Sequence, residues 1–317
     1  MSKKAFTMVE IIVVIVIMGI LSMGTLISIK HLYTRAAKTN AITSFSANSE
    51  ILLNQISSLL YDRVPMSAIG YDAKSSNFKS IYDIDNNFTV LEWIGVASEA
   101  LKARDYSGFI DMDASDRDTN TTVSYDVNKS DLNTTEFKKF GISYTYANPN
   151  DANVTALIFA GSFDSGVLSS KDFNSSFGWH GHKHDIIYDI TKIEDDNITL
   201  ATRPKEIYEK YYLVDSAYAV ARGKDVNIST CRTKTRADTD DTLYLFYNYR
   251  PWKNETFCAD LIETNGTRDG NVTILAQNVT AFKAGLINDS IYFDVTLSKK
   301  IIGNDNNVTI SKQKVVF

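Results

Sequence analysis

Three of the four histidines are spaced two residues apart, at His180, His182 and His184. Side chains two residues apart in an extended segment point to the same side. A face that carries three imidazoles can hold Zn²⁺, and Asp185 or Asp189 could complete the ligand set. The alternative is a solvent-exposed polar loop or strand without a ligand. The spacing therefore predicts either a metal site at these histidines or a solvated segment.

The rest of the chain carries no spacing typical of a catalytic centre. Gly-x-Ser-x-Gly, a phosphate-binding glycine loop and His-Glu-x-x-His are all absent. Aspartate-rich turns such as Asp195-Asp196 could bind Ca²⁺, but none has EF-hand spacing. A net charge of -5 gives no reason to expect a nucleic-acid partner. We therefore expect a protein that is not an enzyme and has no resident cofactor, with Zn²⁺ or Ca²⁺ as the open alternatives.

Two further features concern covalent modification outside the cytoplasm. Cys231 and Cys258 are the only cysteines, and in an extracytoplasmic domain an even pair predicts a disulfide. Two independent buried thiols are the alternative.

Eleven asparagines begin an Asn-x-Ser/Thr sequon and also have Asp or Glu two residues upstream. With this composition, independent placement predicts on the order of half a match. This extended pattern resembles the acceptor of the oligosaccharyltransferase of certain Gram-negative bacteria, which implies N-glycosylation on periplasmic turns and loops. The alternative is that Asp, Asn and Thr share turns for backbone reasons. The eleven are Asn87, Asn120, Asn128, Asn133, Asn153, Asn174, Asn197, Asn227, Asn265, Asn271 and Asn307.

The N-terminal segment must place these groups relative to a membrane. Residues 6–29 are mostly apolar and carry no charge apart from Glu10, and as a helix they span roughly 36 Å, enough to cross a bilayer. Lys3 and Lys4 precede them, so the positive-inside tendency puts the N-terminus in the cytoplasm. A carboxylate inside the apolar segment costs about 2.5–3.5 kcal/mol, which indicates a partner for Glu10.

The run from Lys3 through Ala5, Phe6 and Thr7 to Glu10, followed by the apolar stretch, resembles the leader of bacterial prepilins. The resemblance implies that residues 1–5 are a leader, cut between Ala5 and Phe6 by prepilin peptidase, and that Phe6 is then N-methylated. It also assigns Glu10 to assembly, because the matching acid of that family meets the N-terminal amine of a neighbouring subunit. The chain departs at Ala5, where the family usually has glycine. A plain signal anchor is the alternative.

The apolar helix is expected to continue beyond the membrane. Ile42, Phe45, Ser49, Leu52 and Ile56 recur at three- and four-residue spacing, and Pro65 marks the end. We therefore predict one helix over about residues 6–63, with 6–30 in the membrane and 31–64 as an amphipathic continuation. An anchor followed by a separate soluble helix is the alternative.

Residues 65–317 are expected to form one β-rich periplasmic body, since the hydrophobic fraction of 44% and the charged fraction of 22% are ordinary for a globular protein. A further helix is predicted over 88–104, and an exposed excursion over 111–133. The predicted class is α+β, a long helix packed on antiparallel sheet. Strand-like runs rich in Tyr, Val and Ile occupy 154–160, 186–190, 211–221, 242–249, 272–275, 291–297 and 308–317.

Residues 275–297 resemble the tail of J-type minor pseudopilins and PilW-like minor pilins. The resemblance implies a large subunit in the tip or priming complex of a type II secretion, type IV pilus or competence filament, with other pilin subunits and the inner membrane as partners. Major pilins often carry a proline in the second half of the membrane segment, and this chain has none there. The competing interpretations are a pilin-anchored periplasmic adhesin or ligand-binding module, and a metal-dependent enzyme on the same anchor.

Overall fold

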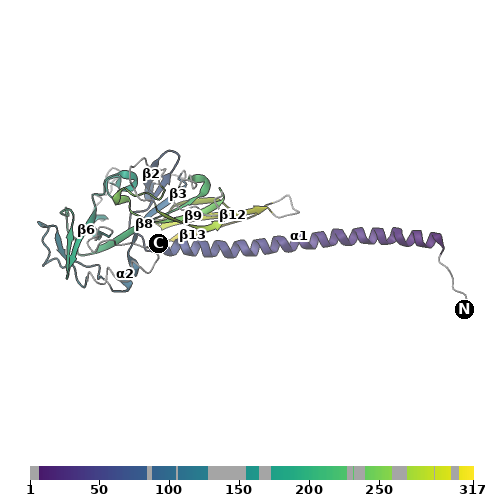
Figure 1. The fold of residues 1–317 in the computed structure, drawn as a ribbon, viewed down its shortest axis with the longest axis horizontal. Helices are drawn as coiled ribbons and strands as arrows, with labels where there is room; N and C mark the ends of the chain where they lie inside the picture. The colour runs from purple at the N-terminus through teal and green to yellow at the C-terminus, as the bar shows by residue number, and fades with distance from the viewer. Residues whose placement is uncertain are drawn as a thin grey trace.

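The C-terminal part of the long helix α1 (Met8–Tyr61) lies on a β-rich body, and its N-terminal part extends far out of that body (Figure 1). The structure is a computed structural model that describes residues 7–83, 88–104, 106–127, 155–163, 173–226, 231, 240–258, 270–288, 290–300 and 307–317. With 54 residues, α1 is about 81 Å long. The single continuous helix predicted from the apolar spacing is confirmed.

Both ends of α1 have identifiable stop signals. At the N-terminus Thr7 is the N-cap, and Thr7 and Glu10 form a reciprocal capping box. At the C-terminus the Asp62 carboxylate accepts hydrogen bonds from the Ser98 hydroxyl (2.7 Å) and from Lys102 Nζ (3.3 Å). The next residues join the sheet, since the Val64 N–H donates to the Ile94 carbonyl over 2.8 Å. The helix therefore ends where the chain becomes part of the body.

The larger sheet has ten strands, and every pairing in it is antiparallel. Its main order is β2-β1-β3-β8-β5-β6-β7-β4, while β9 pairs with β8 and with β10. The long strand β8 holds the sheet together, because β3, β5 and β9 all pair with it. The strands are β1 (Ile69–Asp72), β2 (Asn77–Ser80), β3 (Val90–Val96), β4 (Thr121–Val123), β5 (Ala156–Phe159), β6 (Ile187–Glu194), β7 (Asn197–Leu200), β8 (Tyr211–Arg222), β9 (Thr242–Tyr249) and β10 (Asn271–Gln277).

A second sheet packs against the C-terminal half of α1. It consists of β11 (Val279–Ile287), β12 (Ser290–Lys300) and β13 (Asn307–Val316), in the order β11-β12-β13. Apolar side chains of α1, including Leu52 and Ile56, share one buried cluster with Phe293 and Val295 of β12. The second sheet therefore clamps the helix to the body. The short helices are α2 (Ser98–Lys102) and the 3₁₀ turns η1 (Ile81–Asp83), η3 (Ala160–Phe163), η4 (Trp179–Gly181), η5 (Gly223–Asp225) and η6 (Pro251–Lys253).

The α+β class is confirmed, but two local predictions are wrong. The helix predicted over 88–104 is mostly strand β3, followed by the short α2. Leu91 and Trp93 of β3 face the cluster under α1, while Val90 and Ile94 face a second cluster on the other side. A strand buried on both faces has a continuous apolar run, which periodicity does not distinguish from a buried helix.

The excursion predicted over 111–133 is only partly exposed. Residues 112–114 and 116–120 are exposed turn, but β4 pairs with β7, and Thr122 and Ser124 are buried. Residues 128–133 lie outside the described residues. Polar composition was misleading because Thr122 satisfies its hydroxyl inside the sheet, on the Ile198 carbonyl at 3.5 Å.

Candidate assembly site

The N-terminal half of α1 presents apolar side chains that no other described residue covers. From Met8 to Leu32 no residue of the helix is buried. Among the described residues α1 is the one helix long and apolar enough to cross a bilayer. A core helix of a soluble protein has the same composition but is buried, so its full exposure distinguishes this segment. An exposed apolar surface of this length requires lipid or other helices around it.

Glu10 lies at the first turn of this helix. The Thr7 N–H and the Thr7 hydroxyl donate to the Glu10 carboxylate over 2.9 Å and 3.0 Å. The Glu10 N–H donates back to Thr7 Oγ1 over 3.4 Å. A carboxylate in the first turn of a helix is favoured by the helix dipole. The capping box with Thr7 thus orients the acid at the start of the helix. Ala5 and Phe6 lie outside the described residues.

The C-terminal half of α1 is fixed to the body by polar contacts as well as by its core. Lys312 Nζ of β13 donates to the Ser46 carbonyl over 2.9 Å and to the Glu50 carboxylate over 3.1 Å. Lys314 donates to the amide oxygen of Asn54, which lies about one turn after Glu50 on the helix. The direction of the helix relative to the body is therefore set by β13.

The same half of α1 keeps an uncovered side. Phe45, Leu52 and Ile56 are buried against the body, whereas Ile51, on the other side of the helix, is 56% exposed. Among the described residues, Ile51 belongs to none of the buried clusters. Ile42 is also exposed, although it has the spacing of the docked face and precedes Phe45 by about one turn. The helix thus offers both side chains to a neighbouring molecule.

The structure does not bring the three histidines together. The segment is not extended: His180 lies in η4 with φ of 49°, and its ring stacks on Tyr71 with ring centroids 3.8 Å apart. His182 is exposed and packs edge-on against Phe78, and His184 Nδ1 lies 3.3 Å from the Ile187 carbonyl. In the part of the chain that the structure describes, no three His, Cys, Asp or Glu side chains are grouped to hold a metal ion. The spacing argument failed because a left-handed residue turns the chain between them.

His180 instead joins a buried polar cluster that the sequence analysis missed. Its Nε2 lies 2.8 Å from Glu92 Oε1, and the Tyr249 hydroxyl donates to Glu92 Oε2 over 2.7 Å. The Glu92 side chain is 1% exposed and that of His180 is 8% exposed. Burial, reinforced by the Glu92 charge, raises the pKa of Tyr249 far above its ordinary value. The sequence offered one indication of this cluster, since Glu92 stands inside the apolar run Val90–Val96 and a buried acid needs a polar partner. The arrangement is a buried hydrogen-bonded cluster that links η4, β3 and β9.

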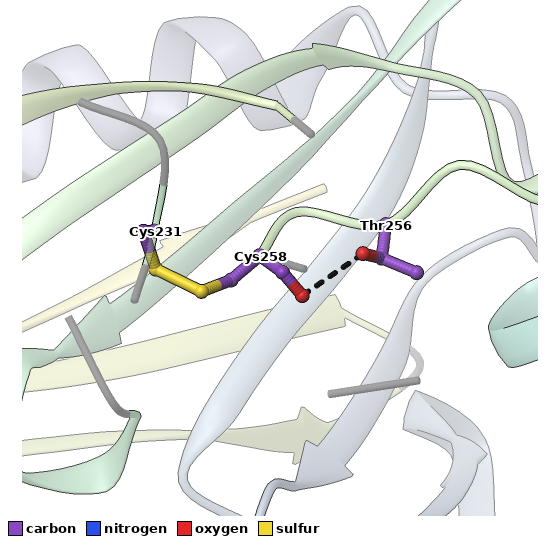
Figure 2. The surroundings of a disulfide bond; sticks show 3 residues. All are labelled: Cys231, Thr256 and Cys258. Atoms are coloured by element: carbon purple, nitrogen blue, oxygen red, sulfur yellow. Dashed lines mark hydrogen bonds between the residues drawn. A yellow bond between two sulfur atoms is a disulfide. The ribbon is translucent and has the colours of Figure 1, made fainter. Parts of the chain in front are cut away.

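The disulfide predicted from the cysteine pair is present. Cys231 and Cys258 are joined with an S–S distance of 2.14 Å, and both are buried in the larger core cluster. Figure 2 shows the bond and the hydrogen bond that the Thr256 hydroxyl donates to the Cys258 carbonyl over 2.9 Å. The bridge ties the segment after β9 to the segment between β8 and β9.

Five of the eleven extended sequons fall in the described residues. Asn120, Asn174, Asn197 and Asn307 are exposed and Asn271 is half-buried. Each lies in a bend or turn or at the first residue of a strand. The other six, Asn87, Asn128, Asn133, Asn153, Asn227 and Asn265, lie outside the described residues.

Comparison with known proteins identifies the N-terminal segment. The family model of the prokaryotic N-terminal methylation motif matches residues 1–26. No curated protein and no solved structure matches the chain. The matched residues include the leader, Glu10 and most of the exposed apolar half of α1. The chain is thus type IV pilin-like in the segment through which such subunits are processed and held in the membrane.

Proposed function

We propose that this protein is a minor pilin or pseudopilin subunit in the tip or priming complex of a type II secretion, type IV pilus or competence filament. The observation that carries the proposal is α1 itself. One uninterrupted helix begins in a methylation motif, exposes an apolar membrane-length half, and ends clamped to a large body. A plain signal anchor has no need for a rigid connection of this kind.

In this proposal the chain is cut before Phe6, methylated there, and held in the inner membrane with its body in the periplasm. Assembly then consists of helix packing. The exposed apolar half of α1 exchanges lipid for neighbouring helices, and the Glu10 carboxylate receives the amine of another subunit in addition to its Thr7 contacts. Beyond the membrane segment, Ile42 and Ile51 supply further exposed apolar area.

The size of the body supports a minor subunit over a repeating one. The described part of residues 65–317 forms two sheets around three buried clusters, which makes a bulky body. A bulky body is most easily accommodated at a filament end, where it has fewer neighbours. The likeness of residues 275–297 to J-type and PilW-like tails points the same way, and these residues include all of β11 and most of β12, which contacts α1. The proposal includes N-glycosylation of the body by an oligosaccharyltransferase.

The test compares Glu10→Gln with Glu50→Gln in the native host. Glutamine at position 10 keeps an oxygen to accept from Thr7, so the helix cap is retained and only the charge is lost. We expect the Glu10 variant to stay in the membrane but to be absent from filaments, and the Glu50 variant to assemble. Normal co-assembly of the Glu10 variant would contradict the proposed role.

Processing is tested independently by intact mass. Native material should lack residues 1–5 and carry one methyl group on Phe6. A mass that includes the leader would end the proposal. In a deletion strain, loss of filaments supports the assembly role, whereas normal filaments with lost surface binding would favour a pilin-anchored adhesin.

A further inference from the structure

The chain contains its own comparison set for the extended sequons. Asn254, Asn278 and Asn288 also begin Asn-x-Ser/Thr, but none has an acid two residues upstream. All three have a left-handed backbone, with φ of 58°, 62° and 47°. Asparagine tolerates this conformation better than most residues, so backbone geometry alone explains why it occurs there.

The acid-preceded sequons lack that explanation. None of the five described ones, at Asn120, Asn174, Asn197, Asn271 and Asn307, is among the described residues with positive φ. A left-handed backbone therefore accounts for the plain sequons but not for these five asparagines. In the sequon of Asn197, a left-handed backbone explains the acid, since Asp195 has φ of 48°. It does not explain the asparagine, because Asn197 has no positive φ.

Two of the five place the acceptor asparagine and the hydroxyl residue on the same face of a strand, with Thr309 exposed and Thr199 half-buried. Asn197 begins β7 and Asn307 begins β13, and both are exposed. The residue after each asparagine, Ile198 or Val308, points into the core. Thr199 and Thr309, two residues after the asparagines, lie on the same face as Asn197 and Asn307, because side chains alternate along a strand. Asn271 has the same alternation but is half-buried, and we leave it out of the assignment.

Asn120 and Asn174 are arranged differently. The hydroxyl residue that completes each sequon is buried: Thr122 is 0% and Ser176 is 3% exposed. The Asn120 amide also donates to the Leu200 carbonyl over 2.9 Å. An enzyme that must contact both the amide and the hydroxyl has no access to these two sites once the body has folded.

We propose that the folded body accepts N-linked oligosaccharide at Asn197 and Asn307, and not at Asn120 or Asn174. The inference rests on the periplasmic placement in the proposed function. In the transfer, the asparagine Nδ2 attacks the anomeric carbon of a lipid diphosphate-linked oligosaccharide. The N–C bond forms as the bond from that carbon to the diphosphate oxygen breaks, the lipid diphosphate leaves, and the amide loses one proton.

Both assigned sites leave the packing surface of α1 clear. Asn197 follows β6 in a hairpin, and Figure 1 places β6 at the end of the body away from the N-terminus of the helix. On β13, Lys312 and Lys314 point toward α1, so the alternate position Asn307 points away from it. A glycan at either site thus leaves the outer face of the helix free to pack.

The test uses the full chain, purified in detergent micelles and incubated with a bacterial oligosaccharyltransferase that requires an acid at this position, together with its lipid-linked oligosaccharide. Glycopeptide mass spectrometry should find the sugar at Asn197 and Asn307. It should find none at Asn120 or Asn174, and none at Asn254, Asn278 or Asn288. Synthetic peptides 116–124 and 193–201 are the control, and we expect the enzyme to modify both, because only the fold hides Asn120.

Matched variants isolate the recognition elements at one site. Asp195→Asn keeps a residue that tolerates positive φ but removes the acid, and Thr199→Val removes the hydroxyl while keeping the side-chain shape. Each should abolish modification at Asn197 and leave Asn307 modified. Unmodified Asn197 and Asn307 in the folded chain, an unaffected Asp195 variant, or sugar at Asn120 in the folded chain would each overturn the proposal. The reaction needs no filament, so its failure leaves the assembly role standing.

Discussion

Replacing Ile56 by alanine tests whether α1 is held to the body by its buried face. The Ile56 side chain is 0% exposed and belongs to the cluster that α1 shares with the second sheet. The substitution removes the equivalent of three methylene groups, about 2.4 kcal/mol of transfer free energy. A cavity term adds to this, and measured Ile→Ala costs in cores are about 2–5 kcal/mol. We therefore expect a loss of about 3 kcal/mol in the free energy of unfolding.

Ile51→Ala is the matched control, since it makes the same change five residues earlier on the same helix. Its side chain is 56% exposed, so the expected cost is below about 0.5 kcal/mol. At about 2–4 °C per kcal/mol for a body of this size, Ile56→Ala should lower Tm by roughly 6–12 °C and Ile51→Ala by about 2 °C at most.

Thermal unfolding of the full chain in detergent micelles, followed by tryptophan fluorescence, measures both variants. All three tryptophans, Trp93, Trp179 and Trp252, are buried in the body, so their emission reports its unfolding and not that of the membrane half. Equal decreases in Tm for Ile56→Ala and Ile51→Ala would show that the helix is not docked through the face that carries Ile56. A shift near zero for Ile56→Ala would show that the helix is not packed on the second sheet.

Three other predictions concern the interior of the body. Replacing both Cys231 and Cys258 by serine should lower the free energy of unfolding by about 3–4 kcal/mol, because the bridge closes a loop over a separation of 27 residues. Unfolding in denaturant checks this. An unchanged stability of the unsubstituted protein after its disulfide is reduced would contradict it. Burial raises the pKa of Asp215 to about 6, although Arg250 acts to lower it. The folded state therefore binds the Asp215 proton more tightly than the unfolded chain does. This raises the free energy of unfolding by about 3 kcal/mol below about pH 4, and the contribution is lost as the pH rises through 6. Asp215→Asn should remove that slope in Tm against pH, and parallel profiles would refute the assignment. His180→Ala should cost about 1–3 kcal/mol, since it removes a hydrogen bond from the buried Glu92 side chain, and clearly less in a Glu92→Gln background; equal costs in a double-mutant cycle would show that the two groups do not interact.

The sequence by itself determined the features that depend on order along one segment. The membrane-length helix follows from the apolar run after Glu10, and its docked face from the spacing of Phe45, Leu52 and Ile56. Strands such as β8 and β12 were predicted because β-branched and aromatic residues fill them. The methylation motif is also a property of consecutive residues.

Only the tertiary structure decided which distant groups meet. His180 pairs with Glu92, 88 residues away, because η4 packs beside β3, and no local pattern of histidines indicates that partner. β3 is a strand because two separate cores cover its faces, and a one-dimensional pattern cannot show this. The sequons at Asn120 and Asn197 are equivalent in sequence and both asparagines are exposed, yet Thr122 of β4 is fully buried while Thr199 of β7 is only half-buried. The physical reason is common to all three: burial depends on what the rest of the chain brings to a site, and only folding determines it.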